Sequence, residues 1–231
     1  MTDPRHRLIV ALDVSSAAAA RKIVAAVGDS AHTYKVGMQL YTAEGPAIVR
    51  ELVSSGRRVF LDLKYHDIPN TVGAAVRESA QLGVSMLTVH ASGGAQMLRA
   101  ATEAAAQSKP PWVLAVTVLT SLDDADLNTL GIRENVLGQV LRLAALALSN
   151  GCRGVVASAH EAAALREDLG PDFVIVTPGV RPAGSGHADQ VRVVTPAEAV
   201  SFGATHIVVG RPITEAADPA AEARAILGQL G

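Results

Sequence analysis

The segment "FLDLKYHDIPNT", residues 60–71, decides the fold. Its first residues are apolar, as in a buried strand, and Asp62, Lys64 and Asp67 then place three charges where that strand should end. Pro69 follows at once, and proline is well suited to the first turn of a helix. The segment therefore predicts a strand followed by a helix, with charged side chains gathered at the carboxyl end of the strand.

The same order of apolar strand and helical stretch recurs along the whole chain. Eight strands are expected, at 8–13, 32–37, 57–64, 84–91, 112–120, 154–159, 173–180 and 206–211. Strands that are apolar on both faces are typical of a parallel sheet covered by helices. Eight such units without a linker predict a single domain over 1–231, an α/β protein of the closed (β/α)₈ TIM-barrel class. The alternative is an open doubly wound sheet, which the lack of G-x-G-x-x-G after the first strand disfavours.

The composition excludes several classes of function. Hydrophobic residues make up 49% of the 231 residues and charged residues 18%, which is ample material for a core. The net charge of −2 disfavours a nucleic-acid or membrane-surface binder, which would need a basic excess. Cys152 is the only cysteine, so no intrachain disulfide can form. The first residues lack the pattern of a secretory signal, and no apolar run approaches the roughly 18 residues of a membrane span. A cytoplasmic protein is expected.

Polar and charged residues, and one glycine, stand at the ends of several predicted strands, where a barrel carries its catalytic groups. They are Asp13, Lys35, Asp62, Lys64, Thr120, Ser121, Arg181, Gly210 and Arg211. Because side chains alternate along a strand, Asp62 and Lys64 should point the same way. A buried structural ion pair is the simpler alternative, but such pairs are often no more stabilising than apolar replacements, so a whole cluster favours function.

Other residues have ordinary structural interpretations. Asp67 or Asn70 could cap the helix after the third strand. The glycine-containing segment 181–190 could be a mobile lid or a plain surface loop. His90 and His206 are interpreted as packing residues, because no histidine has a metal-ligand partner at useful spacing. The acidic segment 122–135 is expected to be a loop that leads into a helix.

The pattern D-x-K-x-x-D-I-P-N-T at 62–71 closely resembles the signature of the orotidine 5′-phosphate decarboxylase family. D-x-K-x-x-D alone is less specific, because sugar-phosphate decarboxylases and aldolases of the same superfamily share it. The similarity covers essentially the whole chain. It includes "ALD" at 11–13, "KVG" at 35–37, "TVHASGG" at 88–94, "TVLTS" at 117–121, "TPGVRP" at 177–182 and "VVGRPI" at 208–213.

The resemblance implies conversion of orotidine 5′-monophosphate to UMP and CO₂, the last step of UMP synthesis, without a metal or an organic cofactor. It implies a charged catalytic network of Lys35, Asp62, Lys64 and Asp67, with Lys64 as the proton donor. It also implies a homodimer in which Asp67 and Thr71 reach the neighbouring site. The implied substrate-binding residues are Asp13, Lys35 and Asp62 near the ribose and reacting ring, Thr120 with Ser121 at the pyrimidine, Arg181, Gln190, Gly210 and Arg211 at the phosphate, and Thr71.

These residue types suit the reaction on physical grounds. Loss of CO₂ leaves a carbanion-like carbon with no adjacent carbonyl to spread its charge. An ammonium held at that carbon can stabilise the charge and then supply the proton, a contribution of about 10²–10⁴-fold as a general acid. The flanking carboxylates Asp62 and Asp67 favour the charged form of Lys64.

Two rival functions follow from the same sequence. The first is the Mg²⁺-dependent 3-keto-gulonate 6-phosphate decarboxylase of the same superfamily, in which a glutamate that helps hold the metal occupies the position of Lys35. A lysine there would repel Mg²⁺, which prefers carboxylate oxygens. The second is a barrel that binds nucleotides without turnover, which should lack at least one of the four network residues.

Overall fold

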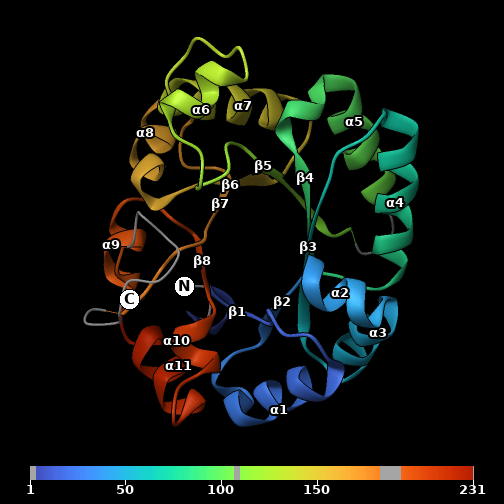
Figure 1. Cartoon of the computed structure of the whole chain (residues 1–231), viewed down its shortest axis with the longest axis vertical. Helices are drawn as coiled ribbons and strands as arrows, with labels where there is room; N and C mark the ends of the chain where they lie inside the picture. Colours follow the sequence, from blue (N-terminus) through green and yellow to red (C-terminus); the bar gives the residue numbers. More distant parts are fainter. Residues whose placement is uncertain (1–3, 107–109, 183–193, 231) are drawn as a thin grey trace.

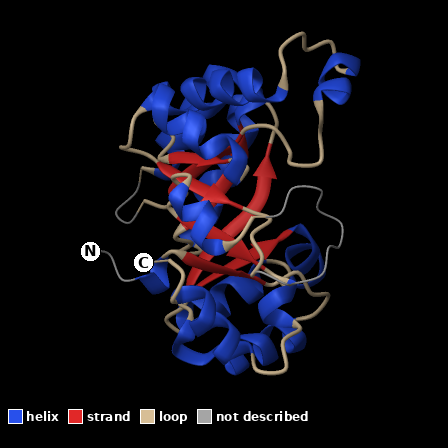
Figure 2. Ribbon diagram, turned by 90° about the vertical axis from the view of Figure 1, so that its left-hand side faces the viewer, coloured by secondary structure: helices blue, strands red, loops and turns tan. Residues whose placement is uncertain are grey.

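Eight parallel strands close into a barrel in chain order in the computed structural model, which describes residues 4–106, 110–182 and 194–230. The strands lie inside a ring of helices (Figure 1), and the view from the side shows the same enclosure (Figure 2). The (β/α)₈ barrel is thus confirmed, and the open sheet is wrong. The strands are β1 Leu8–Ala11, β2 Thr33–Gly37, β3 Arg58–Tyr65, β4 Met86–His90, β5 Trp112–Val116, β6 Gly154–Val156, β7 Val174–Thr177 and β8 His206–Val209.

Helices follow every strand and cover the outside of the barrel. The α-helices are α1 Ala17–Val27, α2 Met38–Glu44, α3 Pro46–Ser54, α4 Pro69–Gln81, α5 Gly94–Ala105, α6 Asp124–Thr129, α7 Val136–Ser149, α8 Ala159–Leu169, α9 Pro196–Ser201, α10 Arg211–Thr214 and α11 Pro219–Leu227. Short 3₁₀ turns lie at η1 Pro4–His6, η2 Gly28–Ser30 and η3 Ala91–Gly93. Within these described ranges, no helix is long and apolar enough to cross a bilayer.

The structure corrects three details of the sequence interpretation. The helical stretch after β2 is divided into α2 and α3 at Gly45, whose φ of 63° suits glycine. The segment 122–135 contains a helix of its own, α6, because Asp123 forms a capping box with Asp126. Strand β5 ends at Val116 rather than at residue 120, and β1, β6, β7 and β8 end two or three residues earlier than expected, so the residues directly after them are loop and not strand.

Apolar side chains form two layers of core. The larger layer lies between the barrel and its helices. The smaller fills the barrel interior and consists of Ile9, Ala11, Phe60, Met86, Leu114, Val174, Val176 and Val208, with Trp112 and Val156 packed against it. This packed interior leaves no pore, and it supports the side chains that stand at either end of the strands.

The start of α4 fixes the loop that leaves β3. Pro69 occupies the first turn, as the sequence predicts, but the N-cap residue is Ile68, and no side chain caps the helix. Asp67 instead accepts the backbone N–H of Ile68 at 2.6 Å. The expectation that Asp67 or Asn70 caps α4 is therefore wrong, and Asp67 keeps an exposed carboxylate.

Candidate active site

Four charged side chains meet at the carboxyl ends of β1, β2 and β3. The Lys35 ammonium lies 2.7 Å from Asp13 Oδ1 and 3.9 Å from Asp62 Oδ2. The Lys64 ammonium lies 2.8 Å from Asp62 Oδ1. The result is a row of alternating charge, Asp13–Lys35–Asp62–Lys64, in which each cation lies beside at least one carboxylate. Such a row holds two ammonium groups in fixed positions.

The backbone brings Asp62 and Lys64 together by a bulge rather than by simple alternation. Leu61 pairs with Leu87 of β4, but the next pair joins Tyr65 to Val89, so β3 has extra residues between the two pairs. Lys64 has a φ of 52°, the only positive φ of a residue other than glycine in the described parts of the chain. A non-glycine residue in this conformation costs on the order of 1–3 kcal/mol, and such strain is found where a side chain is aimed at a functional site.

Gly37 leaves the space that the ion pair of Lys35 and Asp13 occupies. A Cβ at this position would lie 3.0 Å from the Lys35 ammonium nitrogen and 3.2 Å from Asp13 Oδ1. Its φ of −94° is open to any residue, so close approach and not backbone freedom favours glycine here. The sequence interpretation gave Gly37 no role. Its place at the end of β2, two residues after a charged side chain, is the signal that could have identified it.

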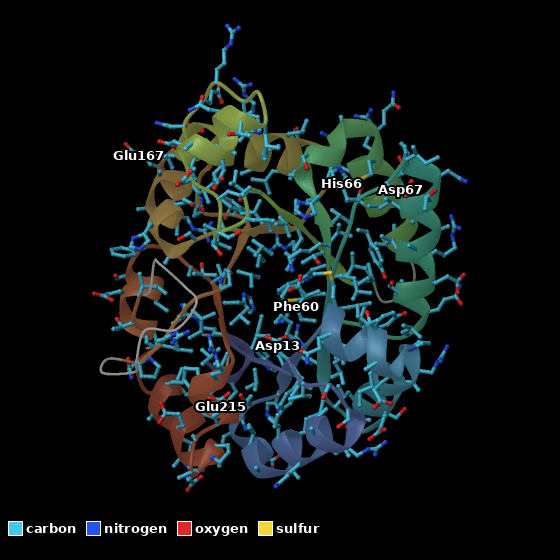
Figure 3. The ribbon with its side chains drawn as sticks, in the orientation of Figure 1. Asp13, Phe60, His66, Asp67, Glu167 and Glu215 are labelled. Carbon is cyan, nitrogen blue, oxygen red and sulfur yellow. The ribbon has the colours of Figure 1, made fainter. Side chains whose placement is uncertain are left out.

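The row of charges lines a cavity of about 620 Å³ at the mouth of the barrel. Phe60, which is almost fully buried, belongs to the lining, and Figure 3 shows it beside Asp13 at the centre of the ring of helices. Apolar Val118, Leu119 and Val180 line other parts of the wall. A flat ring against the apolar wall would therefore lie within reach of the ammonium groups.

The part of the cavity rim that follows β7 and β8 carries two arginines, and β8 lies next to β1. Arg181 and Arg211 line this part of the rim, together with Gly210. Arg181 is 8% exposed, and its backbone N–H bonds the carbonyl of Val194 at 2.9 Å. Two guanidinium groups with an exposed backbone turn suit a phosphate or another dianion. Gln190 and most of the segment 181–190 lie outside the described residues.

The remaining predicted site residues divide into two groups. Thr120 lines the cavity from the turn after β5, whereas Ser121 is exposed and is not part of the lining. Asp67 and Thr71 are exposed beside and on α4 and do not line the cavity of their own chain. Figure 3 shows Asp67 near the start of α4, away from Asp13. The structure thus joins three of the four network residues within one chain, and Asp67 is not among them.

The histidines near the mouth do not form a metal site. The rings of His66 and His90 are tilted, with their centroids 5.4 Å apart. Burial lowers the pKa of His90, and His66 and the Lys64 ammonium lower it further. No group of three histidine, cysteine or acidic residues in the described ranges could hold a metal ion. Cys152 is buried, which raises its pKa to about 12, so its thiol is inert.

Comparisons with known proteins agree with this geometry. A model of the orotidine 5′-phosphate decarboxylase / HUMPS family matches residues 6–226. The orotidine 5′-phosphate decarboxylase of Moorella thermoacetica is 54% identical over 233 residues, which is 98% of this chain and 92% of the relative. That of Idiomarina loihiensis is 50% identical over 226 residues, 97% of this chain and 98% of the relative. The crystal structure of orotidine 5′-phosphate decarboxylase from Lactobacillus acidophilus has a TM-score of 0.88 at 41% identity and covers 98% of this chain and 99% of its own.

Proposed function

The chain belongs to the orotidine 5′-phosphate decarboxylase / HUMPS family, and on that premise we propose that it decarboxylates orotidine 5′-monophosphate with Lys64 as the proton donor. The reaction yields UMP and CO₂ and is the last step of UMP biosynthesis. The family match and the names of relatives about half identical over nearly the full chain support the reaction. The roles of the individual side chains are argued from the geometry of the site.

The row of alternating charge is the observation that carries the proposal. Decarboxylation leaves an electron pair on the ring carbon that held the carboxylate. Lys64, fixed against Asp62 at 2.8 Å, presents an ammonium to the cavity in which that carbon would lie. The ammonium stabilises the developing negative charge and then transfers its proton to the carbon, so that the C–H bond replaces the C–C bond. Because the charges are held before the substrate arrives, little reorganisation is needed during the reaction.

The basic rim supports binding of the substrate by its phosphate. Arg181 and Arg211 line the cavity from the loops after β7 and β8, and we assign the phosphate to them and to Gly210. Gln190 is proposed as a fourth phosphate ligand from its place in the motif. Thr120 is proposed at the pyrimidine, and Asp13 and Lys35 at the ribose. Binding energy from the unreacting phosphate can then hold the ring at Lys64.

The exposed position of Asp67 supports a homodimer. Asp67 and Thr71 cannot serve the cavity of their own chain from where they lie, but a partner across α4 could receive them. Ile68, next to Asp67 in the chain, is 67% exposed, and a partner on this face would cover it. We therefore include Asp67 and Thr71 in the partner's site.

Mixing subunits tests the dimer directly. Lys64→Ala and Asp67→Ala each remove one contribution, so homodimers of either variant should be inactive. In a mixed dimer, one of the two sites is complete: the Asp67→Ala subunit supplies its own Lys64, and the Lys64→Ala subunit supplies Asp67 to that site. Activity that returns on mixing supports the shared site, whereas mixtures as inactive as the separate variants contradict it.

The position of Lys35 distinguishes the proposal from its Mg²⁺-dependent rival. Its ammonium lies between Asp13 and Asp62, at the place where a cation bound by these carboxylates would have to lie. We therefore propose a reaction independent of metal and organic cofactor, carried out in the cytoplasm as a step of nucleotide synthesis.

The test is turnover by protein stripped of metal. The chain is treated with EDTA and mixed with orotidine 5′-monophosphate, and formation of UMP is followed by the change in ultraviolet absorption. Undiminished turnover is expected. Activity that returns only with Mg²⁺, or activity only on keto-sugar phosphates, would favour the rival enzyme. UMP binding by a folded chain with no turnover would favour the binding-only barrel.

A further inference from the structure

A fully buried threonine lies next to the Lys64–Asp62 pair. Thr88 is in β4, two residues beyond the inward-facing Met86, and has no exposed surface. Its hydroxyl accepts the backbone N–H of Lys64 at 2.9 Å and donates to Asp62 Oδ1 at 3.0 Å. One side chain therefore contacts the backbone of the residue proposed to donate the proton and the carboxylate that anchors it.

The bond between the Lys64 N–H and the Thr88 hydroxyl lies in the bulge, where β3 and β4 do not pair residue for residue. In the bulge, Asp62, Leu63 and Lys64 of β3 lie opposite the single residue Thr88 of β4, between the pairs of Leu61 with Leu87 and of Tyr65 with Val89. The N–H of Lys64 donates to the Thr88 hydroxyl, and Lys64 itself has no paired residue in β4. The acceptor helps to hold Lys64 at its φ of 52°, a conformation that the residue would otherwise leave.

The second bond orients the carboxylate. Asp62 Oδ1 receives both the Thr88 hydroxyl at 3.0 Å and the Lys64 ammonium at 2.8 Å, while Oδ2 faces the Lys35 ammonium at 3.9 Å. A carboxylate with a donor behind it and a cation on each oxygen has little freedom to rotate. The direction of the Lys64 ammonium is then set twice, through its backbone and through its partner.

We propose that Thr88 is a positioning residue for the proposed proton transfer, holding Lys64 and Asp62 in the geometry that the reaction needs. The inference rests on the proposed function. Thr88 does not line the cavity, so it acts through the two charged residues and does not touch the substrate.

A second threonine provides a matched control at the other end of the barrel. The hydroxyl of Thr205, just before β8, accepts the backbone N–H of Ile175 at 3.0 Å and donates to the carbonyl of Ile175 at 2.9 Å. It bridges neighbouring strands as Thr88 does, but its partners are the backbone of Ile175 and, at 2.9 Å, Nδ1 of His206, and neither residue lines the cavity. Loss of either hydroxyl leaves buried polar groups without a partner, so both losses should lower stability.

The experiment compares Thr88→Val, Thr88→Ser and Thr205→Val with the unaltered chain. Valine keeps the shape of threonine and removes the hydroxyl, and serine restores the hydroxyl. For each protein, kcat for orotidine 5′-monophosphate, the Kd of UMP and the free energy of unfolding are measured. We expect Thr88→Val to lower kcat by about 10- to 100-fold, the scale of a misplaced reacting group, with little change in the Kd of UMP. Thr88→Ser should recover most of the loss, and Thr205→Val should lose stability but keep its kcat.

Two outcomes would overturn the assignment while leaving the reaction itself intact. One is a Thr88→Val enzyme with a kcat within about twofold of the unaltered chain. The other is a Thr88→Ser enzyme as impaired as Thr88→Val. A lack of turnover in the unaltered chain would instead overturn the proposed function. A crystal structure of Thr88→Val adds a readout without activity: Lys64 should leave its positive φ or move away from Asp62, and an unmoved pair would contradict the proposal.

Discussion

The two ends of the barrel both carry buried or half-buried charge, but they hold it differently. At the mouth, the side chains of the row from Asp13 to Lys64 form ion pairs with one another, and all of them line the cavity. At the base, where the strands begin, Arg58 stacks over Trp112 at 5.9 Å from the ring centroid and lies 3.3 Å from His6 Nδ1. Among the described residues, the base thus stabilises a cation by contacts with rings, where the mouth uses carboxylates.

The other polar side chains at the base also have their partners within the protein. His206 packs edge-on against Trp112, with the ring centroids 5.6 Å apart, and is 9% exposed. Arg7 donates to three backbone carbonyls, those of Ala204, Thr205 and Leu230. These groups use their hydrogen-bonding capacity within the protein, whereas the ammonium groups of the mouth still face a cavity. The difference is what the proposed function requires, since charge at the mouth would then serve a ligand and charge at the base stability, as is usual in barrels of this class.

After the loss of Lys64 itself, neutralising the centre of the charge row should have the largest effect. Asp62→Asn keeps the shape of the side chain but leaves two ammonium groups without their shared carboxylate. We expect kcat to fall by about 10²–10⁴-fold, the range that a misplaced general acid would lose. Steady-state kinetics with circular dichroism as a folding control check this. If the variant were folded and fully active, the charge row at the mouth would not be needed for turnover, and the proposed difference between mouth and base would be wrong.

Loss of a phosphate contact at the rim should have the next largest effect. Arg211→Ala removes a charged donor, and hydrogen bonds to charged groups contribute about 1.5–3 kcal/mol, so kcat/KM should fall by roughly 10- to 100-fold. The nucleoside orotidine, which lacks the phosphate, should be turned over equally by both enzymes. Arg224→Ala on α11 is the control, because its guanidinium contacts Ser30 and not the cavity. Equal losses for orotidine and its phosphate would contradict the assignment.

Crowding the ion pair should have a smaller effect. In Gly37→Ala the new methyl group displaces the flexible end of Lys35, and we expect a loss of about tenfold in kcat/KM with little loss of stability. Gly228→Ala, whose Cβ would meet its neighbours at ordinary distances of 3.5 Å and beyond, should match the unaltered enzyme. If Gly37→Ala were equally active, the exact position of Lys35 would not matter.

At the base, changes should affect stability and leave turnover alone. Burial, and then Arg58, Arg7 and His6, lower the pKa of His206 to about 4. The ring is protonated in the unfolded chain near pH 6.5. Between pH 6.5 and 4 the unfolded state therefore binds a proton that the folded state does not, and the free energy of unfolding decreases as the pH is lowered. From pH 7 to pH 5 this amounts to about 2 kcal/mol.

His206→Asn removes that titration. The free energy of unfolding of the variant, measured by urea titration at both pH values, should decline less between pH 7 and pH 5 than that of the unaltered chain. At pH 7 its kcat should be unchanged. Equal declines would mean that His206 is not held neutral, and a loss of kcat would show that the two ends are not independent.

The sequence predicts the barrel well because each strand–helix unit repeats the same pattern of apolar residues and charged strand ends. It overestimates some strands. Val118 and Leu119 extend the apolar pattern beyond β5, but residues 117–120 leave the ladder, so Thr120 reaches the cavity from a turn. The division at Gly45 could have been read from the Gly-Pro pair there, since that pair ends one helix and begins another.

The candidate site is predictable in its charges but not in what supports them. Asp62 and Lys64 meet as expected, yet through a bulge that alternation does not foresee. Thr88 reads as one more β-branched strand residue. Its signal is weak: a polar residue at an inward-facing position of β4, where an apolar one would fill the barrel. Asp67 and Thr71 could be given a role only by resemblance, because one chain does not bring them to its own cavity.

The most direct test of the central claim is the rate of Lys64→Ala measured beside the unaltered enzyme, with the Kd of UMP and the unfolding transition as controls. The account predicts a folded protein that binds UMP and has almost no turnover, because neither the stabilising charge nor the proton is supplied. A folded Lys64→Ala enzyme with near-normal kcat would contradict it, and the charge row at the mouth would then be structural, like the cations at the base.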